Sequence, residues 1–104
     1  MWWAALHPGP DREQEGCRPV VVVASDGYLE VVDTLAIVVP VTTTGRGTVE
    51  PCRLAGELGL GSESWAMTEQ PSTVARSRLV RAAGRVDEAC LRAIQIRLAD
   101  FLDL

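Results

Sequence analysis

The sequence predicts a mainly β fold, a small barrel with a single α-helix at its C-terminus. Two apolar runs, residues 20–24 and 35–41, are rich in valine and too short for helices, and their lack of polar side chains is typical of strands buried on both faces. From residue 87 onwards apolar side chains recur at helical spacing: Leu91, Ile94, Leu98, Phe101 and Leu102. A chain of 104 residues has room for one hydrophobic core, so we expect a single domain, residues 1–104.

The first part of the chain predicts a strand, a loop, a second strand and a turn. Residues 1–6 are apolar and short, as in an opening strand whose Trp2 and Trp3 point to opposite faces. Of the three tryptophans in the chain we expect at least two in the core. Residues 7–16 combine proline, glycine and charged side chains, which predicts an exposed loop, and residues 25–28 predict a turn after the first valine run.

The middle of the chain gives weaker signals. Residues 48–54 alternate weakly and predict an outer strand, and the glycines that follow predict a loop up to Glu63. Residues 64–69 predict a third strand, which Pro71 ends. Residues 73–86 are mixed, and we expect a short helical turn near residues 77–81 followed by a brief strand near residues 84–86. Asp87 stands where an N-cap of the final helix is expected.

Composition narrows the class of protein. With 47% hydrophobic and 23% charged residues the chain is typical of a globular protein, and no apolar run approaches the ~20 residues that a membrane span needs. The N-terminus lacks the basic lead of a secretory signal, so we expect a cytoplasmic protein. Three cysteines without paired spacing favour buried or half-buried thiols over a disulfide framework or a zinc site.

The net charge of −4 argues against nucleic-acid binding, but the charges are unevenly placed. Four arginines fall within ten residues that contain no acid: Arg76, Arg78, Arg81 and Arg85. This segment is either a solvated face or a local positive surface. All ten basic residues are arginine, which reflects either a need for bidentate phosphate contacts or a coding bias.

Polar side chains capable of chemistry stand where the predicted strands begin or end. Pro19 restricts Arg18 to extended backbone, so the arginine projects at the start of the first valine strand. There it either covers a core edge with its aliphatic stem or binds an anion. Thr42 closes the second valine strand, and Glu69 with Gln70 closes the third strand. We find no metal-ligand cluster, no Ser, His and Asp set and no phosphate-binding glycine motif.

Longer segments carry a family resemblance. The runs EQEGCRPVVVVAS, AIVVPVTTTGRG and LGLGSESWAMTEQPSTVARSRL, with the final DFLDL, resemble the MazF/PemK family of toxins from bacterial toxin-antitoxin pairs. The resemblance covers nearly the whole chain, and the loop that leads into Arg18 and Pro19 is its most specific part. It implies a homodimer of SH3-like barrels, related in fold to CcdB, that cleaves single-stranded RNA or mRNA without a metal or other cofactor. It also implies a cyclic phosphate product and a cognate antitoxin that holds the toxin inactive.

The resemblance also assigns residues. Arg18 matches the arginine of the family's RP motif and Thr42 the hydroxyl residue after the apolar strand, and we take both as catalytic candidates. An arginine is a poor general base, so proton abstraction falls to Glu13, to Glu69 or to water. Gln14 and Gln70 match glutamines of the family and are expected to contact substrate. We expect the same of Ser72, Thr73, Arg46, Arg76 and Arg78.

Two departures from the family pattern keep other functions open. Ser72 stands where the family has an arginine before the threonine, and the usual arginine, glycine and acid before the first strand are missing, as if that strand were truncated or the start assigned late. An attenuated toxin homologue is therefore one alternative. The other is a non-catalytic inhibitor that binds gyrase, because the gyrase-poisoning toxins share this fold.

Overall fold

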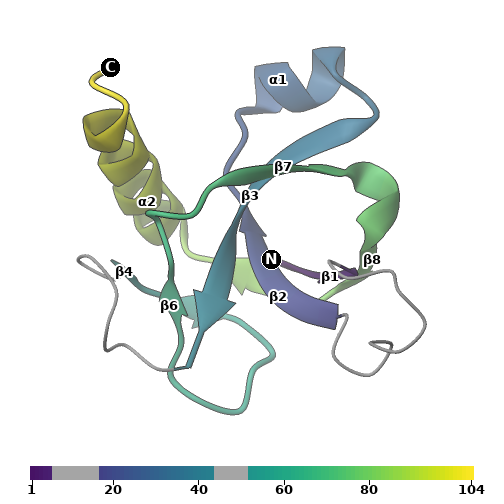
Figure 1. Cartoon of the computed structure of the whole chain (residues 1–104). Helices are drawn as coiled ribbons and strands as arrows, with labels where there is room; N and C mark the ends of the chain where they lie inside the picture. The colour runs from purple at the N-terminus through teal and green to yellow at the C-terminus, as the bar shows by residue number, and fades with distance from the viewer. Residues whose placement is uncertain (6–16, 44–51) are drawn as a thin grey trace.

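The computed structural model describes residues 1–5, 17–43 and 52–104 (Figure 1). The predicted mainly β fold with a C-terminal helix is confirmed, and Glu13, Gln14 and Arg46 lie outside the described residues. In chain order the elements are β1 (Trp2–Ala5), β2 (Cys17–Val22), α1 (Asp26–Val31), β3 (Leu35–Thr42), β4 (Cys52–Arg53), β5 (Gly56–Glu57), β6 (Trp65–Ala66), β7 (Ser72–Ala75), the 3-10 helix η2 (Arg76–Arg78), β8 (Leu79–Ala82), β9 (Arg85–Val86) and α2 (Glu88–Phe101).

The main sheet is antiparallel and is built around β3. Its strands follow the order β4-β6-β3-β2-β1-β8, and β7 pairs with the first half of β3. The strands β5 and β9 form a separate pair. Among the described residues β4 and β8 stay at opposite edges of this path, so the sheet is not closed into the barrel that the sequence suggested.

The valine strands β2 and β3 are buried on both faces, as predicted. They pair with the register Val20↔Pro40, Val21↔Val39 and Val22↔Val38. Val21 and Val39 belong to the larger core cluster, whereas Val20 and Val38 belong to a second cluster on the other face. This two-sided burial explains why the runs contain no charged residue.

Helix α2 supplies the cover for the larger cluster. Cys90 and Ile94 of the helix are buried against Val21, Val39 and Ala66. Asp87 is the N-cap residue and has extended backbone, as predicted, although its side chain makes no capping hydrogen bond. No described helix has the length and apolar character needed to cross a membrane.

Two local predictions are wrong. The predicted turn at residues 25–28 is the start of α1, whose N-cap Ser25 accepts the Tyr28 N–H at 3.1 Å through Oγ, with Asp26 in the first turn. The expected tryptophan core is also absent, because Trp2 is 37% exposed and Trp3 and Trp65 are half-buried. Valine, alanine and isoleucine fill the core instead.

The segment after Pro71 is more regular than predicted. Ser72–Ala75 forms the strand β7, which pairs with β3 from Val38↔Ser72 to Leu35↔Ala75. The helical turn comes slightly earlier than expected, as η2, and β8 then pairs with β1. The final strand, β9, lies within the expected residues and pairs with β5.

Candidate functional site

Arg18 lies near the start of β2, with its side chain exposed and its backbone opposite Ala4 of β1. Alternate residues of a strand share a face, so Arg18 lies on the face of Val20. Val20 belongs to the second cluster, whereas α2 packs on the other cluster. The arginine is therefore presented on the face of the sheet that α2 does not cover.

Thr42 is the last residue of β3 and is half-buried. It is opposite Trp65 of β6. By alternation from Val38, which belongs to the second cluster, Thr42 lies on the same face of the sheet as Arg18.

The sheet divides between these two residues. The pairing of β2 with β3 ends at Val20↔Pro40, and beyond this pair β2 continues beside β1 while β3 continues beside β6. Figure 1 shows the beginning of β2 and the end of β3 spreading apart. We call the place where β2 residues 17–19 diverge from β3 residues 41–42 the strand fork. Arg18 stands on one arm of the strand fork and Thr42 on the other.

The missing N–H of Pro19 accounts for the strand fork. The Pro40 carbonyl accepts the Met67 N–H at 2.8 Å, so this carbonyl faces β6 and not β2. Hydrogen-bonded pairs alternate along an antiparallel ladder, and the next such pair between β2 and β3 would join Val41 to Pro19. Because Pro19 has no N–H to donate, the ladder loses a bond at this point.

Glu69 lies at a different place from Arg18. It lines a pocket of about 260 Å³ with Pro71 and three residues from the end of α2, Leu98, Phe101 and Leu102. Its Oε1 atom is buried and has no hydrogen-bond partner. The structure therefore places the Glu69 carboxylate against the end of α2.

The residues after Glu69 are exposed. The Gln70 N–H donates to the Met67 carbonyl at 3.0 Å, which closes a tight turn before β7. Ser72 is opposite Val38 of β3 and so shares the face of Thr42, whereas Thr73 is opposite Ile37 and lies on the other face. Only Ser72 of this pair is on the face that presents Arg18.

Arg76 and Arg78 bind backbone carbonyls. Arg76 is half-buried; its Nε donates to Leu35 O at 3.0 Å and its Nη2 to Val32 O at 2.9 Å and to Leu29 O. These bonds hold η2 against the end of α1 and the start of β3. Arg78 Nη1 donates to Ala5 O at 2.9 Å. Both arginines have a structural contact that the sequence did not reveal.

Burial shifts the pKa of two groups. It lowers the pKa of the Met1 amine, which donates to Gly84 O at 3.0 Å, and the nearby Arg85 adds to this effect. Burial is also the main reason that the pKa of the Cys52 thiol is raised, and the nearby Cys90 adds to this increase. Arg97 lowers the same pKa by a smaller amount. Within residues 1–5, 17–43 and 52–104, no group of histidine, cysteine and acidic side chains is arranged to hold a metal ion.

The sequence did not reveal which residues neighbour Thr42. Trp65 is opposite Thr42 on one side and opposite Arg53 of β4 on the other. Strand alternation in residues 64–67 was a signal for the orientation of Trp65. The partner Arg53 was not predictable in this way, because β4 has only two residues.

The comparison with protein families decides the class of the chain. Residues 1–102 match the family described as PemK-like, MazF-like toxin of type II toxin-antitoxin system. The chain belongs to this family. The resemblance read from the strand ends and the loop before Arg18 is therefore confirmed, and the chain is a MazF-like toxin.

Solved MazF structures share the fold of this MazF-like toxin. The Mycobacterium tuberculosis toxin MazF-mt6 has a TM-score of 0.76 and 22% identity, and the match covers 99% of this chain and 95% of that chain. MazF (Form-I) from Deinococcus radiodurans has a TM-score of 0.74 and 23% identity, and the match covers 99% of this chain and 92% of that chain. A chain of MazE-MazF (Form-II) from the same organism has a TM-score of 0.74 and 20% identity. The match covers 98% of this chain and 89% of that chain.

Proposed function

We propose that this MazF-like toxin is a sequence-selective endoribonuclease that cleaves single-stranded RNA without a metal. The observation that carries the proposal is the placement of Arg18 and Thr42 on one face of the sheet, on the two arms of the strand fork. A guanidinium and a hydroxyl group presented on one face of the sheet suit an RNA phosphate. Membership of the toxin family supports the same activity.

The proposed reaction uses the 2′-hydroxyl of the RNA as nucleophile. The 2′-oxygen attacks the adjacent phosphorus and loses its proton, the bond from phosphorus to the 5′-oxygen breaks, and the 5′-oxygen gains a proton. The products are a 2′,3′-cyclic phosphate and a 5′-hydroxyl. Arg18 donates to the phosphoryl oxygens, and Thr42 orients one of them, so that charge developing on these oxygens is stabilised.

Proton transfer requires a group other than Arg18, because a guanidinium stays protonated. Glu13, Glu69 and water are the candidates. The Glu69 carboxylate lies in the pocket at the end of α2, which favours Glu13 or water as the base. In this proposal Gln14, Arg46, Gln70, Ser72 and Thr73 contact the flanking nucleotides. Arg76 and Arg78 approach the RNA only with donors that their carbonyl contacts leave available.

We also propose an antitoxin partner and a homodimer. MazE-MazF structures from Deinococcus radiodurans share the fold of this chain, which supports a MazE-like partner here. Exposed apolar side chains supply surface for either contact, among them Trp2, Val31, Leu35, Val80, Ile96 and Phe101.

The test is cleavage of mixed-sequence RNA in EDTA by the wild type, Arg18→Ala and Thr42→Val. Sequencing of the product ends gives the preferred site, and end chemistry identifies the cyclic phosphate. Arg92→Gln is the matched control, because Arg92 is exposed on α2 and carries no proposed role. We expect both site variants to lose at least about 100-fold in rate, as for loss of an oxyanion donor, and the control to keep full rate.

Three results would contradict this assignment. Full activity of Arg18→Ala or Thr42→Val removes that residue from the mechanism. Inhibition of gyrase by a wild-type protein that leaves RNA intact identifies the non-catalytic alternative. Absence of both activities identifies an attenuated homologue, in which case Ser72→Arg is the variant with which to seek restored cleavage.

A further inference from the structure

A row of three side chains crosses the edge of the sheet beside the strand fork. Thr42 of β3 is opposite Trp65 of β6, and Trp65 is opposite Arg53 of β4. Side chains at opposite positions of antiparallel strands lie on the same face, roughly 5 Å apart at their Cβ atoms. Thr42, Trp65 and Arg53 therefore form one continuous row, which we call the Trp65 row.

The neighbouring residues fix the face on which the Trp65 row lies. Val41, Ala66 and Cys52 are opposite one another in the adjacent positions of the same strands, and all three pack in the core beneath α2. By alternation the Trp65 row is on the other face. This is the face on which Arg18 stands, so the Trp65 row and Arg18 lie on the same face of the sheet.

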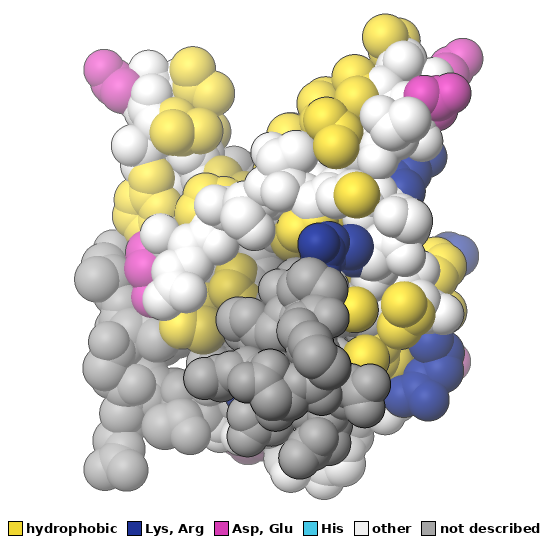
Figure 2. Space-filling model, turned by 45° about the vertical axis from the view of Figure 1, so that its right-hand side comes forward, with side chains coloured by type: hydrophobic (Ala, Val, Ile, Leu, Met, Phe, Trp, Pro, Cys, Tyr) yellow, Lys and Arg dark blue, Asp and Glu magenta, His cyan; other side chains and the backbone are white. Residues whose placement is uncertain are grey.

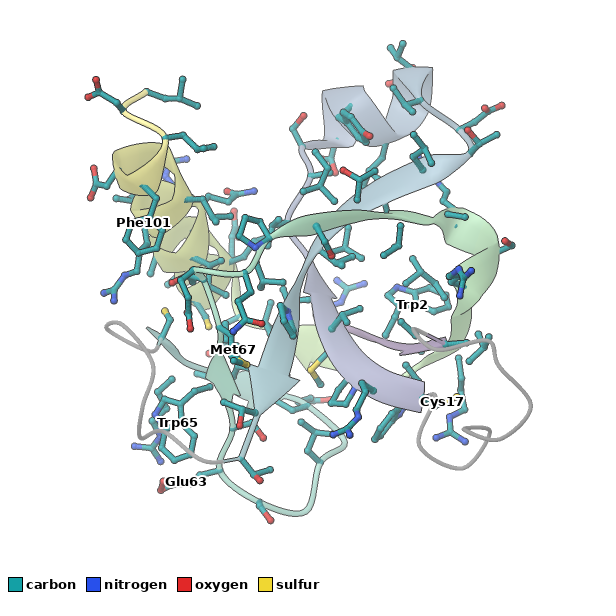
Figure 3. The ribbon with its side chains drawn as sticks, viewed as in Figure 1. Trp2, Cys17, Glu63, Trp65, Met67 and Phe101 are labelled. Carbon is teal, nitrogen blue, oxygen red and sulfur yellow. The ribbon has the colours of Figure 1, made fainter. Side chains whose placement is uncertain are left out.

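The Trp65 row has the chemistry of a nucleotide subsite. Trp65 is half-buried, and Figure 3 shows it beside Glu63 at the edge of the sheet away from Cys17. Arg53 is exposed, and its Nη2 donates to Glu63 Oε1 at 3.0 Å, which leaves other guanidinium N–H donors available.

We propose that Trp65 stacks the base of a nucleotide next to the cleaved phosphate, and that Arg53 contacts the following phosphate or the edge of that base. The inference rests on the proposed RNA cleavage. A phosphate at Thr42 places a base attached through its ribose over the adjacent strand position, which Trp65 occupies. Aromatic stacking is the main way in which proteins hold single-stranded bases, and arginine suits their phosphates and edges.

The test measures binding of a 2′-O-methyl oligonucleotide of about ten random nucleotides, because the methyl group blocks cleavage. Fluorescence anisotropy gives its affinity for the wild type, Trp65→Leu, Trp65→Phe and Arg53→Gln. Trp3→Leu and Arg92→Gln are matched controls: Trp3 alternates with Ala4 and so lies on the other face, and Arg92 is on α2. Thermal unfolding confirms that each variant is folded.

We expect Trp65→Leu to weaken binding roughly tenfold to hundredfold, as for loss of one stacked base, and Trp65→Phe to stay within about threefold. Arg53→Gln should weaken binding and reduce its salt dependence, because one phosphate contact is lost. Both controls should bind as the wild type does.

The outcomes separate this inference from the proposed function. Equal affinity of Trp65→Leu and the wild type overturns the stacking role, even if unmodified RNA is cleaved, and leaves Trp65 as a contact for a protein. Failure of the wild type to bind the oligonucleotide overturns both proposals. Binding that depends on Trp65 without cleavage of unmodified RNA supports the stacking role and overturns only the proposed reaction.

Discussion

At the residue scale the proposed chemistry depends on the shape of one cation. Arg18 is exposed, so its substitution leaves the core unchanged. Its guanidinium presents several donors in one plane and so can hold two phosphoryl oxygens together, whereas a lysine ammonium is a single point charge. Charge and geometry at this position are therefore separable by substitution.

Arg18→Lys keeps the charge and removes the planar fork. We expect kcat to fall by about 100-fold, because stabilisation of the developing charge needs aligned donors, while the unfolding temperature stays unchanged. Single-turnover cleavage of a mapped RNA site and thermal unfolding measure the two quantities. A lysine variant with wild-type kcat would show that only the positive charge matters.

Arg76 stabilises the fold through its contacts with backbone carbonyls. Its guanidinium holds three carbonyls that terminate α1 and begin β3. Arg76→Gln leaves these acceptors without their charged donor, so we expect the free energy of unfolding in urea to fall by about 2 kcal/mol. Arg92→Gln on the exposed face of α2 should change it by less than about 0.5 kcal/mol. Equal stability of the two variants would show that water replaces Arg76.

At the element scale the strand fork follows from a missing donor. Pro19→Val supplies an N–H opposite Val41 and lets the β2–β3 ladder continue. We expect the new amide to be protected from hydrogen exchange and RNA cleavage to slow, because the arms that hold Arg18 and Thr42 are drawn together. A freely exchanging residue-19 amide would show that the strand fork has another cause.

Elements with strong local signals were predictable. The burial of the valine strands and of one face of α2 was predictable from the apolar residues within each element. The positions of Arg18 and Thr42 at strand ends follow from the same apolar runs. Helix α1 was missed because six residues containing Gly27 give little helical periodicity. The short strand β4 and the carbonyl contacts of Arg76 depend on segments distant in sequence, so local patterns do not encode them.

At the scale of the whole molecule, stability should depend on pH through Cys52. Burial raises its pKa in the folded state, so between the unfolded and folded pKa values the folded protein holds a proton that the unfolded chain has lost. The contribution of Cys52 to stability is therefore fully present below about pH 8.5 and declines as the pH rises above this.

Replacement of this thiol tests the dependence. Cys52→Ala should flatten the alkaline decline in the free energy of unfolding, measured in urea between pH 7 and pH 10. Cys17→Ala is the matched control, since Cys17 is exposed. An equally steep decline in Cys52→Ala would assign it to other groups. The Met1 amine acts in the opposite direction, because its lowered pKa makes stability rise as the pH increases towards 8.

Two parts of the molecule project from its body with apolar side chains uncovered. Figure 2 shows hydrophobic side chains on both projections, which are the ends of α1 and α2, and Val31 is 82% and Leu102 62% exposed. Exposure of this kind is typical of surfaces that meet other chains. The proposed homodimer predicts twice the chain mass in sedimentation equilibrium, and a single-chain mass at micromolar concentration would contradict it.

The order of strands has a consequence for synthesis of the toxin. The first strand, β1, has β8 as its second neighbour, and α2 packs against the core beneath β2 and β3. Both β8 and α2 follow the valine strands in the chain and are translated after them. A chain whose synthesis stops early thus leaves its valine strands uncovered and is a substrate for proteases, so a truncated product should be harmless to the cell that made it.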